Sequence, residues 1–256
     1  MKRNTDYKNA ALAALKGNWG KAVLATVIFM AIMYLAIGPF TYQTVKMQTY
    51  ARENMPQVSS GTSLGSAMRE AMEMSLSMAQ DPEYLELQSK ANGSMGLYYL
   101  LLFFVIMPMV VGFANAFLRL LVQGDNALSE NMYKIATKNY WHKVWGMFLV
   151  NVFVFLWSLL LIIPGIVKMF SYSMTPFILE EHPELTANEA IDHSRAMMKG
   201  HKFDLFWLAL SFLGWMILCL FTLGIGYLWL IPYMQTSIAG FYEDVKADYE
   251  LNGGLI

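Results

Sequence analysis

Residues 159–181 read LLLIIPGIVKMFSYSMTPFILEE, an apolar run that is interrupted at Pro164-Gly165 and contains one cation, Lys168. Proline and glycine interrupt helices and allow tight reversals, so this stretch predicts two apolar helices that form a hairpin. A lysine at the centre of a bilayer-spanning helix costs about 2.5 to 3.5 kcal/mol on insertion scales. The stretch therefore raises two questions, namely whether the chain lies in a membrane and what holds Lys168 there.

The composition of the whole chain favours a membrane setting. Of its 256 residues, 56% are hydrophobic and 14% are charged, whereas about a quarter of an ordinary soluble domain is charged. The net charge of −1 gives no basic field, so we expect no nucleic-acid partner. The single cysteine, Cys219, rules out an internal disulfide and a Cys-based zinc site. We expect neither a cofactor nor a bound metal.

Six apolar runs are long enough, or nearly so, to cross a bilayer. A spanning helix needs about 20 mainly apolar residues, because the hydrocarbon core is about 30 Å thick and each residue rises about 1.5 Å. The two shorter runs follow a Pro-Gly or Gly-rich break, so we expect hairpins within a single all-α membrane domain, residues 1–256. The expected spans are residues 22–42, 97–118, 144–163, 166–180, 203–223 and 225–241.

The basic residues predict the orientation of these spans. Lys and Arg near helix ends prefer the cytoplasmic side, and most of the 18 basic residues fall there if both termini are cytoplasmic. Residues 43–96 then form an extracytoplasmic loop insert. Within this insert, an apolar stripe from Leu64 to Met78 and a helix start at Asp81-Pro82-Glu83 predict two helices.

Residues 181–202 predict an amphipathic cytoplasmic helix. Thr186 and Glu189 have the spacing of a capping box, and Gly200 suits a left-handed C-terminal position. We expect the apolar face to lie on the inner leaflet, with Arg195 and Lys199 near lipid headgroups. A ligand or partner site is the alternative. The expected apolar or small face consists of Ala187, Ala190, Ile191, Ser194, Met197 and Met198.

Lys168 allows two interpretations. If the Pro-Gly turn lies at the outer interface, Lys168 is within one helical turn of water and anchors the helix by snorkelling. If the tip is buried, Lys168 faces other helices or a wet cavity, together with hydroxyl-bearing residues on its own helix face. A cation beside hydroxyls suits an anionic headgroup or a carboxylate. The candidate ligand or lipid contacts are Lys168, Ser171, Tyr172, Thr175, Arg195 and Lys199.

The sequence offers little for catalysis. Away from their ends the expected spans contain no His, Asp or Glu, and His182, His193 and His201 lack the spacing of a metal site. No GxxxxGK[ST] nucleotide motif is present. We therefore expect no enzyme but an accessory or scaffold component, with membrane lipids and either a membrane-protein partner or a second copy as its partners. The alternative is a transporter or binder of lipid or of a small anionic amphiphile, using Lys168 and nearby hydroxyls.

Three stretches together resemble a known family. They are KGNWGKA at residues 16–22, IIPGIVKMFSYSMTPFIL at 162–179 and ANEAIDHSRAMMKGHKFDLFWLALSFLGW at 187–215. They are similar to the bacterial multi-pass integral membrane family catalogued as domain of unknown function 975. The pattern AIxxSRxxMKG is more loosely similar to membrane domains fused to glycerophosphodiester phosphodiesterases. The resemblance implies a bacterial cell membrane location and no established activity.

Overall fold

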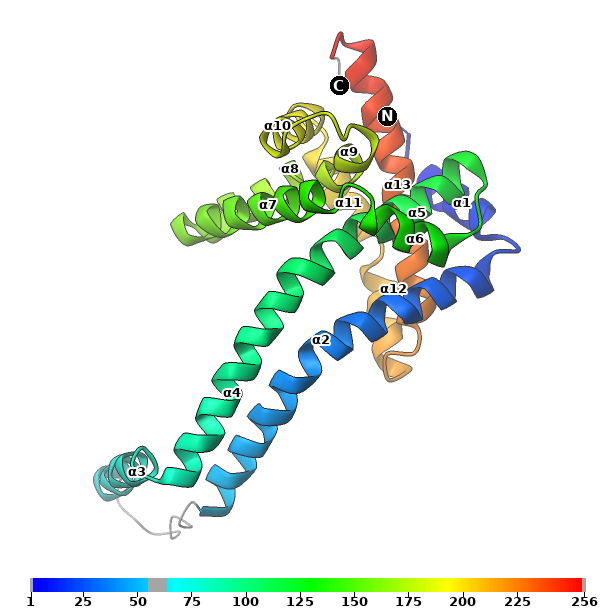
Figure 1. Cartoon of the computed structure of the whole chain (residues 1–256). Helices are drawn as coiled ribbons and strands as arrows, with labels where there is room; N and C mark the ends of the chain where they lie inside the picture. The colour runs from blue at the N-terminus through cyan, green and yellow to red at the C-terminus, as the bar shows by residue number, and fades with distance from the viewer. Residues whose placement is uncertain (1, 55–63, 255–256) are drawn as a thin grey trace. The chain divides into compact units, whose positions relative to one another are not determined.

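The computed structural model describes residues 2–54 and 64–254, and in these ranges it contains helices and no strand (Figure 1). The all-α prediction is therefore confirmed. By its contacts the chain divides into two compact units, unit 1 (Met1–Ala31 and Phe103–Ile256) and unit 2 (Ile32–Leu102). The helices of the first half are α1 (Asn4–Leu15), α2 (Trp19–Asn54), α3 (Leu64–Met78), α4 (Pro82–Leu101), the π-helical η1 (Leu102–Ile106) and α5 (Met107–Gln123). Those of the second half are α6 (Leu128–Thr137), α7 (Tyr140–Leu160), α8 (Ile162–Ser171), α9 (Thr175–Glu181), α10 (Ala187–Met197), α11 (Lys202–Leu210), α12 (Leu213–Phe221) and α13 (Tyr227–Leu251).

Several of these helices are long and apolar enough to cross a membrane. Among the described residues there are four such segments, or five if α1 and Trp19–Leu35 of α2, which meet at a bend of 99°, form one span. The four segments contain or overlap the second to fifth expected spans. The sixth, residues 225–241, lies in α13, which is not among them. The count of six therefore stays a prediction. The four segments are Pro82–Gln123, Tyr140–Leu160, Ile162–Glu181 and Lys202–Phe221.

The loop insert is largely helical in the residues that the structure describes. Both expected helices are present, as α3 and as the start of α4. Asp81 caps α4, because its carboxylate accepts hydrogen bonds from the backbone N–H groups of Glu83 (2.8 Å) and Tyr84 (3.3 Å). The hydroxyl of Tyr50 in α2 donates to the same carboxylate at 2.8 Å. Hydrogen bonding by Tyr50 and by these N–H groups lowers the pKa of Asp81.

The core of unit 1 forms around the short helix α9. This helix packs against α5, α7 and α10, and its Phe177, Ile178 and Leu179 are almost fully buried. The ring of Phe177 stacks on that of Tyr242 from α13, with centroids 4.6 Å apart. Burial of one large apolar side chain contributes about 1.5 to 3 kcal/mol to stability, so α9 holds the neighbouring helices in place.

The hairpin between α7 and α8 reverses earlier than the sequence suggests. The only residue between the helices is Leu161, in an extended conformation, and Pro164 lies in the first turn of α8, where its missing N–H costs nothing. A Cβ atom at Gly165 would lie 2.1 Å from the Ser158 hydroxyl of α7. Pro164-Gly165 is therefore the start of the return helix, and the glycine permits close packing of the two arms.

Helix α10 confirms the predicted capping box and corrects the expected position of its apolar face. Thr186 and Glu189 exchange the capping hydrogen bonds, and the whole expected apolar face is buried. That face packs against α7, α9 and α13 rather than being left free for the inner leaflet. An amphipathic pattern shows only that one helix face packs against an apolar surface, and here that surface is formed by α7, α9 and α13. The opposite face, with Arg195 and Lys199, is exposed.

Candidate functional site

A pocket of about 360 Å³ lies where α8, α10 and the start of α11 meet. Two of its residues come from α8, three from α10, and Lys199 and Lys202 follow α10 in the chain. Four of the residues are cations and one is an acid. We call this the basic pocket, and its lining residues are Lys168, Ser171, Asp192, Arg195, Ala196, Lys199 and Lys202.

The basic pocket brings together four of the six candidate residues that the sequence analysis singled out, namely Lys168, Ser171, Arg195 and Lys199. The other two do not line it. Tyr172 is 5% exposed and its ring lies 6.0 Å from the Lys168 ammonium group. Thr175 is fully buried in α9, and its hydroxyl has no hydrogen-bond partner among the described residues.

Ser194 fixes the position of α10 relative to α8. Its side chain is fully buried, and its hydroxyl donates to the carbonyl of Ser171 (2.9 Å) and accepts from the N–H of Met174 (3.2 Å). Both partners lie where α8 ends and α9 is about to begin, a point at which helical backbone groups lack partners within the helix. These two hydrogen bonds therefore set Arg195, the next residue, beside the α8 wall of the pocket.

The cations of the basic pocket are mostly unpaired. Arg195 forms an ion pair with Asp192 at 2.6 Å, between two side chains that are each more than half exposed. Within the described residues, no carboxylate lies within 4.0 Å of the ammonium group of Lys168, Lys199 or Lys202. Like charges that converge without counter-charges repel one another, so an anion in the pocket would relieve this repulsion.

Lys168 is held by aromatic rings rather than by a carboxylate. Its ammonium group lies 4.4 Å from the centre of the Trp157 ring in α7, a geometry in which the ring face attracts a cation. The group lies in the same pocket as Arg195, Lys199 and Lys202, which the distribution of basic residues predicts to be cytoplasmic. This neighbourhood favours the second interpretation of Lys168, a cation that faces a polar cavity, over a separate anchor at the outer interface.

Three residues of the pocket were not among the candidates, the charged Lys202 and Asp192 and the small Ala196. The signal for Lys202 is its spacing, because Arg195, Lys199 and Lys202 recur at helical intervals of four and three residues. Asp192 stands three residues before Arg195. The sequence could not predict that Arg195, Lys199 and Lys202 share a pocket with Lys168, because this depends on how α8, α10 and α11 pack together.

A second group of charged side chains lies at the end of α9, and we call it the buried cluster. Glu180 pairs with Arg119 at 2.9 Å and with Lys143 at 2.7 Å. The Lys143 side chain is fully buried, and its ammonium group also donates to the carbonyls of Ile135 and Lys138 at the end of α6. The next residue, Glu181, accepts from the Tyr242 hydroxyl at 2.7 Å and from Lys246 at 2.6 Å.

Comparison with known proteins identifies the family of the chain. A family model described as "Protein of unknown function (DUF975)" matches residues 1–249. The chain belongs to the DUF975 family. The match includes every residue of the basic pocket and of the buried cluster, and it confirms the resemblance carried by residues 16–22, 162–179 and 187–215. The looser similarity of this DUF975 chain to domains fused to glycerophosphodiester phosphodiesterases stays a prediction.

No curated protein and no solved structure matches the chain. The DUF975 assignment brings no activity with it, so the chemistry of the basic pocket has to be argued from its own residues. Four cations, a serine and one acid that already has a partner offer no nucleophile activated by a base. What the arrangement can do is bind an anion.

Proposed function

We propose that this protein is a multi-pass protein of the bacterial cell membrane that binds the anionic headgroup of a lipid or small amphiphile in the basic pocket. The observation that carries the proposal is the convergence of four cations on one pocket that holds a single carboxylate. Phosphate and carboxylate groups suit this lining, because a guanidinium group binds them bidentately and ammonium groups add charge-assisted hydrogen bonds. The proposed role is non-catalytic.

An apolar pocket that shares helices α8 and α11 with the basic pocket supports an amphiphile rather than a small free anion. This pocket, of about 250 Å³, is also lined by α8, through Met169 and Phe170, and by α11, through Leu205 and Ala209. Lys202, Leu205 and Ala209 share one face of α11, since they stand three and four residues apart. A headgroup held at Lys202 would thus have apolar side chains further along the same helix face for its chain.

The tip of the α7–α8 hairpin supports the membrane location. Its five consecutive apolar residues, Leu159 to Ile163, are each at least 68% exposed. A contiguous exposed apolar patch of this kind marks a membrane or partner contact. With the tip in hydrocarbon, the cations of the basic pocket would lie nearer the headgroups, where polybasic surfaces gain about 1 kcal/mol per Lys or Arg from anionic lipids.

The test is to extract the protein into lipid nanoparticles without detergent and to identify the co-purifying lipids by mass spectrometry. We expect anionic lipid to be enriched relative to the bulk membrane. The double variant Lys168→Met, Lys202→Met should lower this enrichment more than tenfold, given about 1 kcal/mol, or about fivefold, per cation. Lys134→Met is the control, because it removes a lysine that pairs with Glu130 on α6 and does not line the pocket. Equal loss in the two variants, or no loss, would contradict the proposal.

A second candidate function is the accessory or scaffold role, and one feature of unit 2 favours it. Helix α3 exposes Met68, Met72 and Leu76, with exposed fractions of 66%, 66% and 54%, at intervals of four residues along one face. Methionine-rich faces adapt readily to a partner surface. In the same extraction, a stoichiometric protein that is lost from Met72→Glu and retained by Lys168→Met would support this role.

A further inference from the structure

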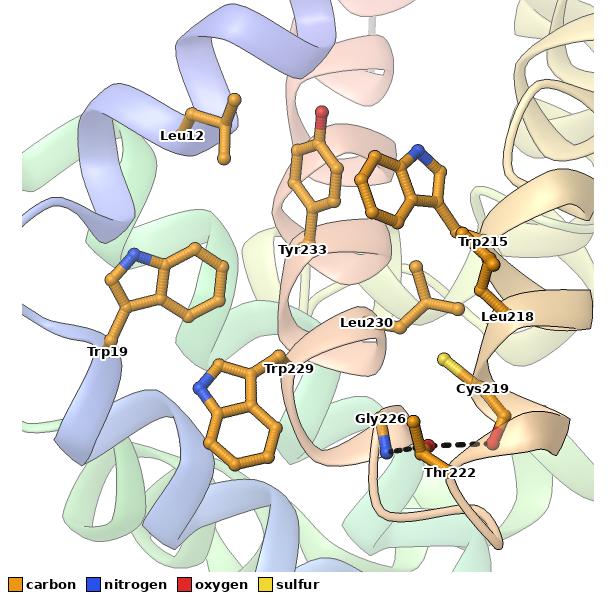
Figure 2. A pocket seen from close by; sticks show the side chains of 10 residues that line it. All are labelled: Leu12, Trp19, Trp215, Leu218, Cys219, Thr222, Gly226, Trp229, Leu230 and Tyr233. Atoms are coloured by element: carbon orange, nitrogen blue, oxygen red, sulfur yellow. Dashed lines mark hydrogen bonds between the residues drawn. The ribbon is translucent and has the colours of Figure 1, made fainter.

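Unit 1 contains another pocket, of about 490 Å³, that shares no residue with the basic pocket. Its walls come from α1, the first residue of α2, α12, the loop that follows α12, and α13 (Figure 2). We call it the tryptophan pocket. Its lining residues are Leu12, Trp19, Trp215, Leu218, Cys219, Thr222, Gly226, Trp229, Leu230 and Tyr233.

The wall of the tryptophan pocket is almost entirely apolar. Figure 2 shows the three indole rings and the Tyr233 ring around a space that Leu12 approaches from α1. No lining residue carries a formal charge. A charged ligand would find no counter-charge here and would lose its hydration, which is costly. The volume lies in the range of about 300 to 1,000 Å³ that is usual for small-molecule sites.

The few polar groups of the pocket that have no partner can all donate hydrogen bonds. Thr222 is satisfied, since its hydroxyl donates to the Cys219 carbonyl (2.8 Å) and accepts from the Gly226 N–H (3.0 Å). Within the described residues, the indole N–H groups of Trp19, Trp215 and Trp229 and the Tyr233 hydroxyl form no hydrogen bond with the protein. An indole N–H can only donate. The occupant should therefore present an acceptor oxygen next to its apolar body.

The surroundings of the pocket indicate where the occupant comes from. Helix α12 ends the candidate span Lys202–Phe221. Beside the pocket, Leu220, Phe221 and Leu223 are 65%, 82% and 94% exposed. Side chains exposed to this degree on a candidate span suit contact with hydrocarbon. The pocket thus adjoins side chains that suit the bilayer interior, which favours a lipid chain as its occupant.

We propose that the tryptophan pocket binds the acyl chain of a membrane lipid, whose ester carbonyl accepts one or two hydrogen bonds from the donors that line the pocket, the indole N–H groups and the Tyr233 hydroxyl. Tryptophan and tyrosine suit this task, because each combines a large apolar ring with one polar atom. The site needs no anionic headgroup, which separates it from the basic pocket. Gly226 contributes by closing the hairpin, because a Cβ there would lie 2.7 Å from the Cys219 sulfur.

The experiment places the full-length protein in nanodiscs of zwitterionic phosphatidylcholine that contain a photoactivatable acyl-chain phosphatidylcholine, and maps the cross-linked residues by mass spectrometry. We expect labelling to concentrate on the lining residues of α12 and α13. Leu12→Trp should fill the space and lower this labelling severalfold, while Leu24→Trp, which changes an exposed leucine of α2 in the same way, should not. Labelling spread evenly over the exposed residues of α12, and unchanged in Leu12→Trp, would overturn the proposal.

A second comparison tests the hydrogen bonds and does not depend on Leu12→Trp folding normally. An ester-linked probe should label the pocket severalfold more than an ether-linked probe of equal chain length, because the ether lacks the carbonyl acceptor. Trp229→Phe, which keeps an aromatic ring and removes the N–H donor, should reduce this difference. Equal labelling by the two probes in the unaltered protein would overturn the assignment of an ester lipid to the pocket.

Discussion

In unit 1, lysine and arginine side chains gather in two places, the buried cluster at the end of α9 and the basic pocket beside α8. Lys143 of the buried cluster is fully buried, pairs with Glu180 and donates to two carbonyls. Lys168 of the basic pocket is partly exposed and has a ring face beneath it but no carboxylate partner among the described residues. The two lysines stand 25 residues apart in one hairpin and have opposite surroundings.

The difference separates structural charge from charge that is available to a ligand. A buried charge costs several kcal/mol unless it is paired, so the fold has to neutralise Lys143 internally. An unpaired cation in an accessible pocket contributes much less to stability than the buried Lys143–Glu180 pair, but it is free to bind an anionic ligand. We therefore expect changes in the buried cluster to alter stability, and changes in the basic pocket to alter binding.

The largest effect should come from Glu180→Ala. The change leaves the buried Lys143 ammonium group without its counter-charge and also frees Arg119. Removing one partner of a buried ion pair typically costs about 3 to 5 kcal/mol. The measurement is the thermal unfolding midpoint of the purified protein, followed by intrinsic fluorescence.

Glu184→Ala is the control for this change. Glu184 pairs with His182 through a side chain that is 66% exposed, so we expect its loss to change stability by no more than about 0.5 kcal/mol. If the two variants unfold at the same temperature, the buried ion pairs contribute no more to stability than an exposed pair. The proposed difference between the buried cluster and the basic pocket would then be wrong.

A smaller effect, on stability and binding together, is expected from Ser194→Ala. The change leaves the Met174 N–H and the Ser171 carbonyl without their partner in a buried position, which costs about 1 to 3 kcal/mol. Because Ser194 sets α10 against α8, retention of anionic lipid should fall as well, although no charge is removed. Ser211→Ala is the matched control, since among the described residues the Ser211 hydroxyl bonds only to the Leu208 carbonyl in its own turn, and Ser211 lines neither pocket of the proposed lipid site. Normal lipid retention in Ser194→Ala would show that the pocket does not depend on this contact.

The features that the sequence predicted well are those that depend on neighbours in the chain. The capping box at Thr186 and Glu189, the start of α4 at Asp81 and the arms of the α7–α8 hairpin all follow from local rules. The four candidate residues that line the basic pocket came from two such patterns, one around Lys168 and one on α10. Each pattern could be predicted from the sequence, but the convergence of the two in one pocket could not.

The features that the sequence could not predict depend on which part of the protein, or of the membrane, packs against a given helix face. The apolar face of α10 would look the same if it met a leaflet, and only the packing against α7 and α9 decides between the two. Pro164-Gly165 looks like a turn, but the reversal falls at Leu161, and Gly165 lies inside the return helix against Ser158 of the other arm. The tryptophan pocket joins residues 12 and 233, a separation that no local rule bridges.

The smallest effect concerns Glu189, which helps to fix where α10 begins and so where Arg195 and Lys199 stand. Hydrogen bonds from the backbone N–H and the hydroxyl of Thr186 lower the pKa of the Glu189 carboxyl below its usual 4.5. A carboxyl whose pKa is lowered in the folded state stabilises the fold above its unfolded pKa, and this contribution is lost as the pH falls through the folded value.

We therefore compare the unaltered protein with Glu189→Gln, which keeps the shape of the side chain and cannot titrate. The advantage of the unaltered protein in unfolding temperature should be constant from neutral pH down to about 4.5 and should shrink below that value. Because the group is exposed, the change should be small, so it is measured as the difference between the two proteins at each pH. A difference that grows as the pH falls would mean that the carboxylate destabilises the start of α10, and the contacts with Thr186 would then not be what positions the cations of the basic pocket.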